Sequence, residues 1–149
     1  MRSQLATLRR IMSIYGVLEE LRSADLLRAT TAVHEVQQAI GGEENAACSA
    51  RTEGRLALGE GDRVGWTASE AGHLAAGVRR ERLEPIRQER LELNETAREQ
   101  YLQSRLKREQ MQRLIVRAEE QMSVEEGRKA QAESDDRFLA RRWAMGPRR

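Results

Sequence analysis

Aromatic side chains make up only 3% of this chain of 149 residues, so it has little bulk for a compact globular core. It has a single cysteine, Cys48, so no disulfide can form within the chain and we expect a fold that does not depend on oxidation. No apolar run approaches the ~20 residues that a membrane-spanning helix needs. These absences predict a cytoplasmic protein with no direct insertion into the membrane.

Residue types that bind metals or act as nucleophiles are also few. The histidines are His34 and His73, and at most Cys48 and His73 could lie near each other, whereas a structural zinc site takes four ligands. Paired acids such as Glu119-Glu120 would need an enclosed pocket to act in catalysis, and a helical rod has none. The glycine clusters lack the Gly-Lys-Ser/Thr element of a phosphate loop. We therefore expect no enzymatic activity, no cofactor and no metal.

Charge, in contrast, is abundant and of mixed sign. Lys and Arg total 26 and Asp and Glu total 24, and the two signs are interspersed along the chain. Such mixing is typical of solvated helix faces, whereas a nucleic-acid footprint needs basic residues clustered on one side. The charge pattern predicts no nucleic-acid partner.

A long charged run from Leu83 to Trp143 predicts a rod-like helix. After Pro85 it contains no proline and, until Gly127, no glycine, and it is rich in residues that favour helix. An unbroken helix of this length would extend about 90 Å, which exceeds any globular core. One apolar stripe has the 3-and-4 spacing of a helix face and comprises Met111, Leu114, Ile115, Ala118 and Met122. We interpret this stripe as the surface that packs against a second helix.

That second amphipathic helix is predicted from the apolar pattern between Leu5 and Ile40. The composition from Glu43 to Leu58 also favours helix, so we predict a helix over about 3–57. Its apolar positions are Leu8, Ile11, Tyr15 and Leu18, followed by Leu26, Ala29, Val33, Val36 and Ile40. The step through Arg22 between the two sets predicts a stutter, at which a heptad pattern shifts while the helix continues.

Glycine is concentrated between Gly41 and Gly77, a stretch that holds eight of the chain's eleven glycines. Glycine inside a helix costs roughly 1 kcal/mol relative to alanine, so this stretch is the weakest part of the rod. The cluster around Gly61 is the best place for the chain to reverse, and we predict a turn over about 58–66.

The second helix is predicted over about 67–143. Thr67 followed three residues later by Glu70 has the form of a capping box, which marks a helix start. Pro85 predicts either a kink in this helix or a break, in which case residues 66–83 form a separate short helix. Both alternatives end in a helical hairpin.

A turn centred near Gly61 would pair residues whose numbers add to about 122, since both helices rise about 1.5 Å per residue. Leu5 would then lie opposite Arg117, and the last helix would overhang its partner by about 20 residues after Gln121. The predicted fold is all-α, with two long helices forming an antiparallel coiled-coil hairpin with an overhanging C-terminal helix. It occupies a single domain over residues 1–149.

Large apolar side chains lie on this predicted overhang, among them the chain's only phenylalanine and one of its two tryptophans. Burying each would contribute roughly 1.5–3 kcal/mol, and the single chain offers nothing to cover them. Arginines beside them supply positive charge. We predict that this end binds a partner through Arg137, Phe138, Leu139, Arg141, Arg142 and Trp143.

Three features of the layout carry a resemblance to a known family. They are the helix beginning Leu5-Ala6-Thr7-Leu8-Arg9-Arg10-Ile11, the stretch Arg108-Glu109-Gln110-Met111-Gln112-Arg113-Leu114 in a longer second helix, and the ending Asp135-Asp136-Arg137-Phe138-Leu139-Ala140-Arg141-Arg142. In these features the chain resembles the FliJ/YscO family, the small stalk proteins of flagellar and virulence type III export. The resemblance implies an antiparallel coiled coil similar to the central shaft of rotary ATP synthases. It implies docking of the paired termini in the hexameric export ATPase, and contacts with the export gate membrane protein and with export chaperones.

The resemblance therefore predicts a non-enzymatic stalk and adaptor that couples the export ATPase to the gate, peripheral at the cytoplasmic face of the inner membrane. Two other classes stay open. One is a self-associating structural coiled coil in which the overhangs of two chains pair. The other is a small holdase-like chaperone that binds unfolded clients through the glycine-rich region.

Overall fold

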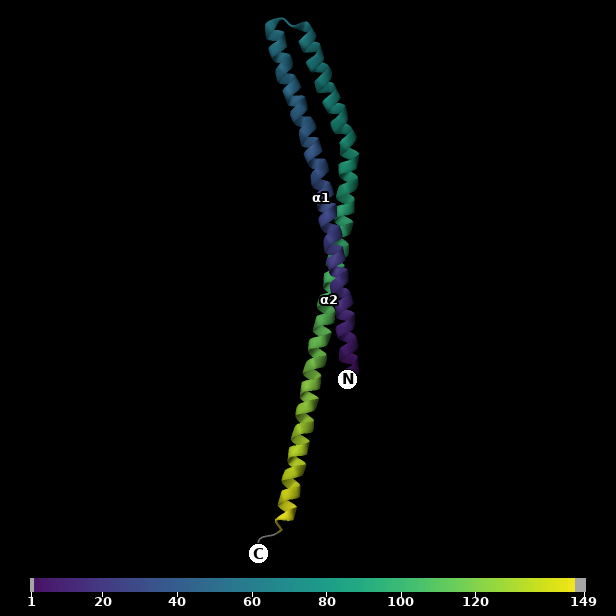
Figure 1. The fold of residues 1–149 in the computed structure, drawn as a ribbon, viewed down its shortest axis with the longest axis vertical. Coiled ribbons are helices and arrows are strands. Elements are labelled where there is room, and N and C mark those ends of the chain that lie inside the picture. The colour runs from purple at the N-terminus through teal and green to yellow at the C-terminus, as the bar shows by residue number, and fades with distance from the viewer. Residues whose placement is uncertain (1, 147–149) are drawn as a thin grey trace. The chain divides into compact units, whose positions relative to one another are not determined.

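The computed structural model describes residues 2–146, and this part of the chain is almost entirely helical. Helix α1 spans Arg2–Glu60 and helix α2 spans Arg63–Ala144, and the two pack against each other (Figure 1). Within the described residues only two short stretches lie outside the helices, the turn Gly61–Asp62 and the end Met145–Gly146. The expectation of an all-helical chain with two long helices is confirmed.

The turn is much shorter than the predicted 58–66. Gly61 adopts φ +74°, and its N–H donates to the Leu58 carbonyl at 3.2 Å while the Asp62 N–H donates to the Ala57 carbonyl at 2.8 Å. These two bonds form a Schellman motif, which satisfies the last carbonyl groups of α1 and needs a residue that tolerates positive φ. One glycine in the left-handed region thus suffices to end the helix, and the glycines on either side of it remain helical.

Asp62 starts the next helix directly. Its carboxylate Oδ1 accepts a hydrogen bond from the Gly65 N–H at 2.9 Å, which makes Asp62 the N-cap of α2. The predicted capping box at Thr67 is wrong. Thr67 lies inside α2, where its hydroxyl donates to the Arg63 carbonyl at 2.8 Å. Because α1 ends at Glu60 and Asp62 already caps α2, the loop between the helices consists of Gly61 and Asp62 alone.

Helix α2 continues through Pro85. The alternative in which residues 66–83 form a separate short helix is therefore wrong, since a single helix runs from Arg63 to Ala144. Proline removes one backbone hydrogen bond and crowds the preceding turn. Packing of α2 against α1 accounts for the continuity, because tertiary contacts override the local preference. A kink at Pro85 stays a prediction.

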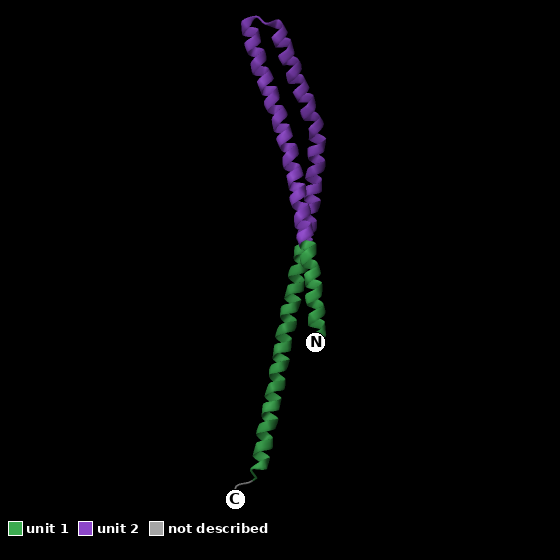
Figure 2. Cartoon of the chain, in the orientation of Figure 1, with its two compact units in different colours: residues 1–19, 104–149 green, residues 20–103 purple. Residues whose placement is uncertain are grey.

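The chain divides into two compact units (Figure 2). Unit 1 comprises residues 1–19 and 104–149, and unit 2 comprises residues 20–103. Each unit contains part of α1 and part of α2.

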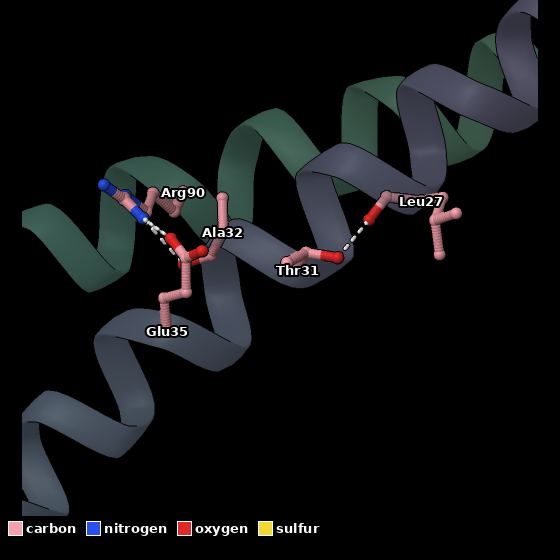
Figure 3. A network of polar contacts seen from close by, with 5 residues as sticks. All are labelled: Leu27, Thr31, Ala32, Glu35 and Arg90. Carbon is pink, nitrogen blue, oxygen red and sulfur yellow. Dashed lines mark hydrogen bonds and ion pairs between the residues drawn. The ribbon is translucent and has the colours of Figure 1, made fainter.

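In unit 2 the two helices run antiparallel, because the contact partners in α1 fall in number as those in α2 rise. The side-chain contacts at 2.9 Å between the helices of this unit are Arg79 to the Glu43 carboxylate, Arg90 to the Ala32 carbonyl, Arg22 to the Gln100 side-chain oxygen and Asn94 to the Thr30 hydroxyl. The residue numbers add to 122 in the first three pairs and to 124 in the last, which agrees with the predicted register of about 122. Arg90 also lies 3.4 Å from the Glu35 carboxylate, and the Thr31 hydroxyl donates to the Leu27 carbonyl nearby (Figure 3).

In unit 1 two ion pairs join the helices. Arg9 donates to the Glu119 carboxylate at 2.7 Å, and Arg108 donates to the Glu19 carboxylate at 2.9 Å. The numbers of these pairs add to 128 and 127, which is about one and a half helical turns beyond the predicted value. The long arginine side chain and its glutamate partner extend toward each other along the helices, so these pairs connect residues that are not directly opposite.

Residues shielded from solvent recur at a seven-residue period along both helices. In α1 the shielded residues that keep this period are Leu5, Leu8, Met12, Tyr15, Glu19, Arg22, Leu26, Ala29, Val33, Val36, Ile40, Glu43, Ala47, Ala50, Gly54 and Ala57, and Ile11, Gly16, Asp25, Ala32 and Gly41 beside them are partly shielded as well. In α2 they include Ser69, His73, Ala76, Leu83, Arg87, Arg90, Asn94, Ala97, Tyr101, Ser104, Met111, Ile115, Ala118 and Met122. The predicted stutter at Arg22 is wrong, because Glu19 and Arg22 occupy the stripe themselves and keep its period unbroken.

Small residues dominate the packed faces near the turn. A Cβ built on Gly54 would lie 3.3 Å from the Ser69 Cβ, and one built on Gly72 would lie 3.8 Å from the Ala50 Cβ. The two backbones therefore approach closely there, which explains glycine at the shielded position Gly54.

Neither α1 nor α2, over the part of the chain that the structure describes, contains an apolar stretch of the length that a membrane-spanning helix needs.

Candidate partner-binding site

The last turns of α2 carry all six side chains predicted to bind a partner. The segment is helical because it consists largely of Ala, Glu, Gln and Arg, and because Arg141 and Arg142 in its last turn suit the negative end of the helix dipole. Helix α2 ends where Gly146 adopts φ +62°, with the Met145 N–H donating to the Arg141 carbonyl at 3.1 Å. The site is thus built on one regular helix.

The apolar side chains of this segment are exposed. Phe138 has 64% of its surface open to solvent, Leu139 has 49% and Trp143 has 85%, whereas Ile115 earlier in α2 has only 7%. Every described residue from Ser123 to Gly146 is exposed. The contrast with Ile115 distinguishes this exposed segment from the shielded stripe earlier in α2.

Charged side chains surround these apolar groups. Arg137 lies 3.7 Å from the Glu133 carboxylate one turn earlier, and the Gln131 amide donates to the Asp135 carboxylate at 2.9 Å. Neither Arg141 nor Arg142 forms an ion pair with another described residue of the chain. Two guanidinium groups are therefore available beside exposed apolar surface.

The structure brings part of the predicted site together in one open hollow. Its lining residues are Phe138, Arg141, Arg142, Met145 and Gly146. Leu139, Trp143 and Arg137 do not line it. Met145, which is 80% exposed and lies just beyond the end of α2, was missed by sequence reasoning, and its place beside Phe138 in the hollow identifies it. The hollow combines an aromatic ring, a thioether and two guanidinium groups, which suits an apolar side chain with acidic neighbours.

A second open hollow lies earlier in α2, around Val124. It is lined by Arg117, Glu120, Gln121, Val124, Glu125 and Arg128, so its walls carry both signs of charge. Val124 is 55% exposed. Val124 is the one large apolar side chain of this hollow, whereas the hollow at Phe138 has two, Phe138 and Met145. The hollow at Phe138 is therefore the better candidate for binding a partner.

The residues considered for metal or nucleophilic chemistry have ordinary surroundings. The His34 ring is hydrogen-bonded to the Gln38 amide at 3.0 Å, and the His73 ring to the Ala47 carbonyl at 3.2 Å. Cys48 is exposed. Among the described residues, no group of three or more His, Cys, Asp and Glu side chains is placed to hold a metal ion.

Comparisons with protein-family models, with curated proteins and with solved structures give no match for this chain. The geometry of the helices and the exposed end of α2 are therefore the observations on which a functional proposal can be built.

Proposed function

We propose that the chain is a stalk and adaptor of type III protein export, which docks the end of α2 into the hexameric export ATPase. In this role it couples the ATPase to the export gate membrane protein and to export chaperones. The observation that carries the proposal is the exposed combination of Phe138, Leu139 and Trp143 with Arg141 and Arg142 at the end of a long helix.

The proposal includes an antiparallel coiled coil as the shaft. The seven-residue period of shielded positions in both helices supports it, since that period is the signature of helices that wrap around each other. The antiparallel contacts of unit 2 support it as well. A shaft of this kind transmits force or motion along its length without any catalytic group.

The proposal also includes a C-terminal overhang, in which α2 extends as a single helix beyond the start of α1. The support is that every described residue after Met122 is exposed, although the segment contains large apolar side chains. Exposed apolar side chains gathered on one segment are typical of a surface that a partner covers. A ring of subunits could enclose such a helix from all sides.

Docking would use the residue types that dominate binding hot spots. Tryptophan and arginine contribute the largest share of interface energy, especially where they enter desolvated pockets. Trp143 and Phe138 would fill apolar pockets, and Arg137, Arg141 and Arg142 would face acidic groups of the ring. The end at Gly61 would lie toward the gate, and the protein would be peripheral at the cytoplasmic face of the inner membrane.

A pull-down of the purified chain with the export ATPase of the same cell tests the proposal. The wild type is compared with Phe138→Ala/Trp143→Ala and with the control Leu27→Ala/Leu56→Ala, which removes two leucines of unit 2 that are 68% and 64% exposed. We expect at least a roughly ten-fold loss of binding for the first variant and wild-type binding for the control, at unchanged helicity. A wild type that does not bind the ATPase would overturn the proposal.

A further inference from the structure

The end of α2 has a symmetric arrangement of charge around an apolar centre. Asp135 precedes Phe138-Leu139 by three residues, and Arg142 follows them by three. Residues separated by three, four and seven positions lie on one face of a helix, so Asp135, Phe138, Leu139 and Arg142 share a face. In a second helix that runs in the opposite direction, Arg142 therefore occupies the place of Asp135, and Asp135 occupies the place of Arg142.

We propose that this face binds the same face of a second copy of the chain, with the two helices antiparallel. In the symmetric register, Asp135 of each copy lies opposite Arg142 of the other, and Phe138 lies opposite Leu139. A two-fold contact of this kind repeats every favourable pair, because the same patch serves on both sides. A parallel contact would instead place Asp135 against Asp135 and Arg142 against Arg142, which is repulsive.

The groups that this contact needs are accessible in the single chain. Phe138 and Leu139 are 64% and 49% exposed. Arg142 forms no ion pair with another described residue, and Asp135 accepts a hydrogen bond from the neutral Gln131 amide, which leaves its negative charge uncompensated. Arg137, in contrast, lies on the opposite side of the helix and is 3.7 Å from Glu133.

Pairing has a consequence for the site assigned above, and this step rests on the proposed function. The second copy covers Phe138 and Leu139, which are the side chains proposed to enter the ATPase ring. Pairing and docking therefore compete, so that a chain without its ring hides its exposed apolar end. This would limit unspecific association of that end.

Sedimentation of the full-length chain at low salt, over a range of concentrations, tests the pairing through charge reversal. Asp135→Arg leaves positive charge at both positions of the face, and Arg142→Asp leaves negative charge at both. Each variant alone should associate at least roughly ten-fold more weakly than the wild type, whereas an equimolar mixture of the two should regain association, because the charges then complement each other. Arg137→Asp makes the same charge change on the opposite side and should associate within about two-fold of the wild type.

Failure of the mixture to regain association would overturn the proposal, as would an equal loss for Arg137→Asp and Arg142→Asp. Circular dichroism of each variant checks that α2 stays helical. The measurement contains no ATPase, so loss of pairing leaves the docking proposal standing. Loss of ATPase binding in the pull-down likewise leaves the pairing to be judged by sedimentation alone.

Discussion

Leucine substitutions at Gly42 and Gly54 test directly whether α1 and α2 pack closely near the turn. Both glycines lie inside α1, but Gly42 is exposed and no described atom lies within 4 Å of a Cβ built on it. At Gly54, which is buried, the added Cβ would lie 3.3 Å from the Ser69 Cβ and 3.7 Å from the Trp66 ring. A leucine side chain at position 42 would therefore extend into open space, whereas one at position 54 would meet α2.

The expected magnitudes follow from two terms. Replacing glycine by leucine in a helix interior contributes about 0.8 kcal/mol at either position, through the difference in helix propensity. At Gly54 the atoms beyond Cβ must also enter filled space, and such overpacking costs about 1–3 kcal/mol. Gly42→Leu should thus stabilise the protein by about 0.8 kcal/mol, while Gly54→Leu should lower the stability by up to about 2 kcal/mol. The difference between the variants isolates the packing term.

Thermal unfolding followed by circular dichroism at 222 nm measures this difference. For a chain of this size one kcal/mol corresponds to about 2–4 °C, so Gly54→Leu should melt about 2–12 °C below Gly42→Leu. Gly54→Ala, which adds the Cβ alone, should fall between them, because Ser69 needs to move by only a few tenths of an ångström. Equal melting temperatures for the two leucine variants would refute the close approach of the helices at Gly54.

Three further predictions concern the turn, the proline and the surface charges. Asp62→Ala should cost about 0.5–2 kcal/mol in urea unfolding because it removes the N-cap of α2, whereas Thr67→Ala inside the helix should change the stability by less than about 0.5 kcal/mol; similar losses for both would contradict the assigned cap. Pro85→Ala should raise the melting temperature, by the equivalent of up to about 3 kcal/mol, because α2 already runs unbroken through this position. A double-mutant cycle on Arg9 and Glu119, whose side chains are 61% and 44% exposed, should give a coupling of roughly 0.2–1 kcal/mol that declines with added salt; a coupling that is insensitive to salt would argue against a surface ion pair.

The apolar stripes could be read from the sequence because their spacing follows the helix period. Ile115, Val33 and Val36 are buried, and Ala118 and Met122 are partly shielded, as the stripes predict. The prediction is wrong for Leu18 and Leu114, which are 39% and 47% exposed. Spacing alone did not identify the polar members of the same faces. Arg90 and Asn94 face α1 through hydrogen bonds to the Ala32 carbonyl and the Thr30 hydroxyl, contacts that only the paired helices reveal.

The glycine-rich stretch misled the prediction for a physical reason. Helix propensity counts each glycine as a cost, so eight of them indicated a long turn. In the folded chain Gly54 sits where a larger residue would meet α2, so its lack of a side chain permits contact between the helices. Local propensity cannot show this, because the gain comes from a neighbour about 15 residues away in the sequence.

The exposure of the apolar side chains at the candidate site could be read from composition, while their binding to a partner stays a prediction. Phe138 and Trp143 stand out in a chain with so few aromatics, and the structure leaves both exposed. The hollow that joins Phe138 to Arg141 and Met145 could not be derived in the same way. It requires the conformation of the last helical turn and of Gly146, which the sequence pattern alone does not specify.

The energy available at this end also limits what kind of partner it can hold. Covering Phe138, Leu139 and Trp143 would contribute roughly 3–6 kcal/mol, because each is already partly shielded by its own helix. Association alone costs about 4–15 kcal/mol in lost freedom of motion, so a partner that touches only these three side chains gains little net affinity. Self-pairing through one face should accordingly be weak and sensitive to salt. Tight docking requires a partner that also engages Arg141, Arg142 and Met145 around the helix, as an enclosing ring would, so a ring should displace the second copy.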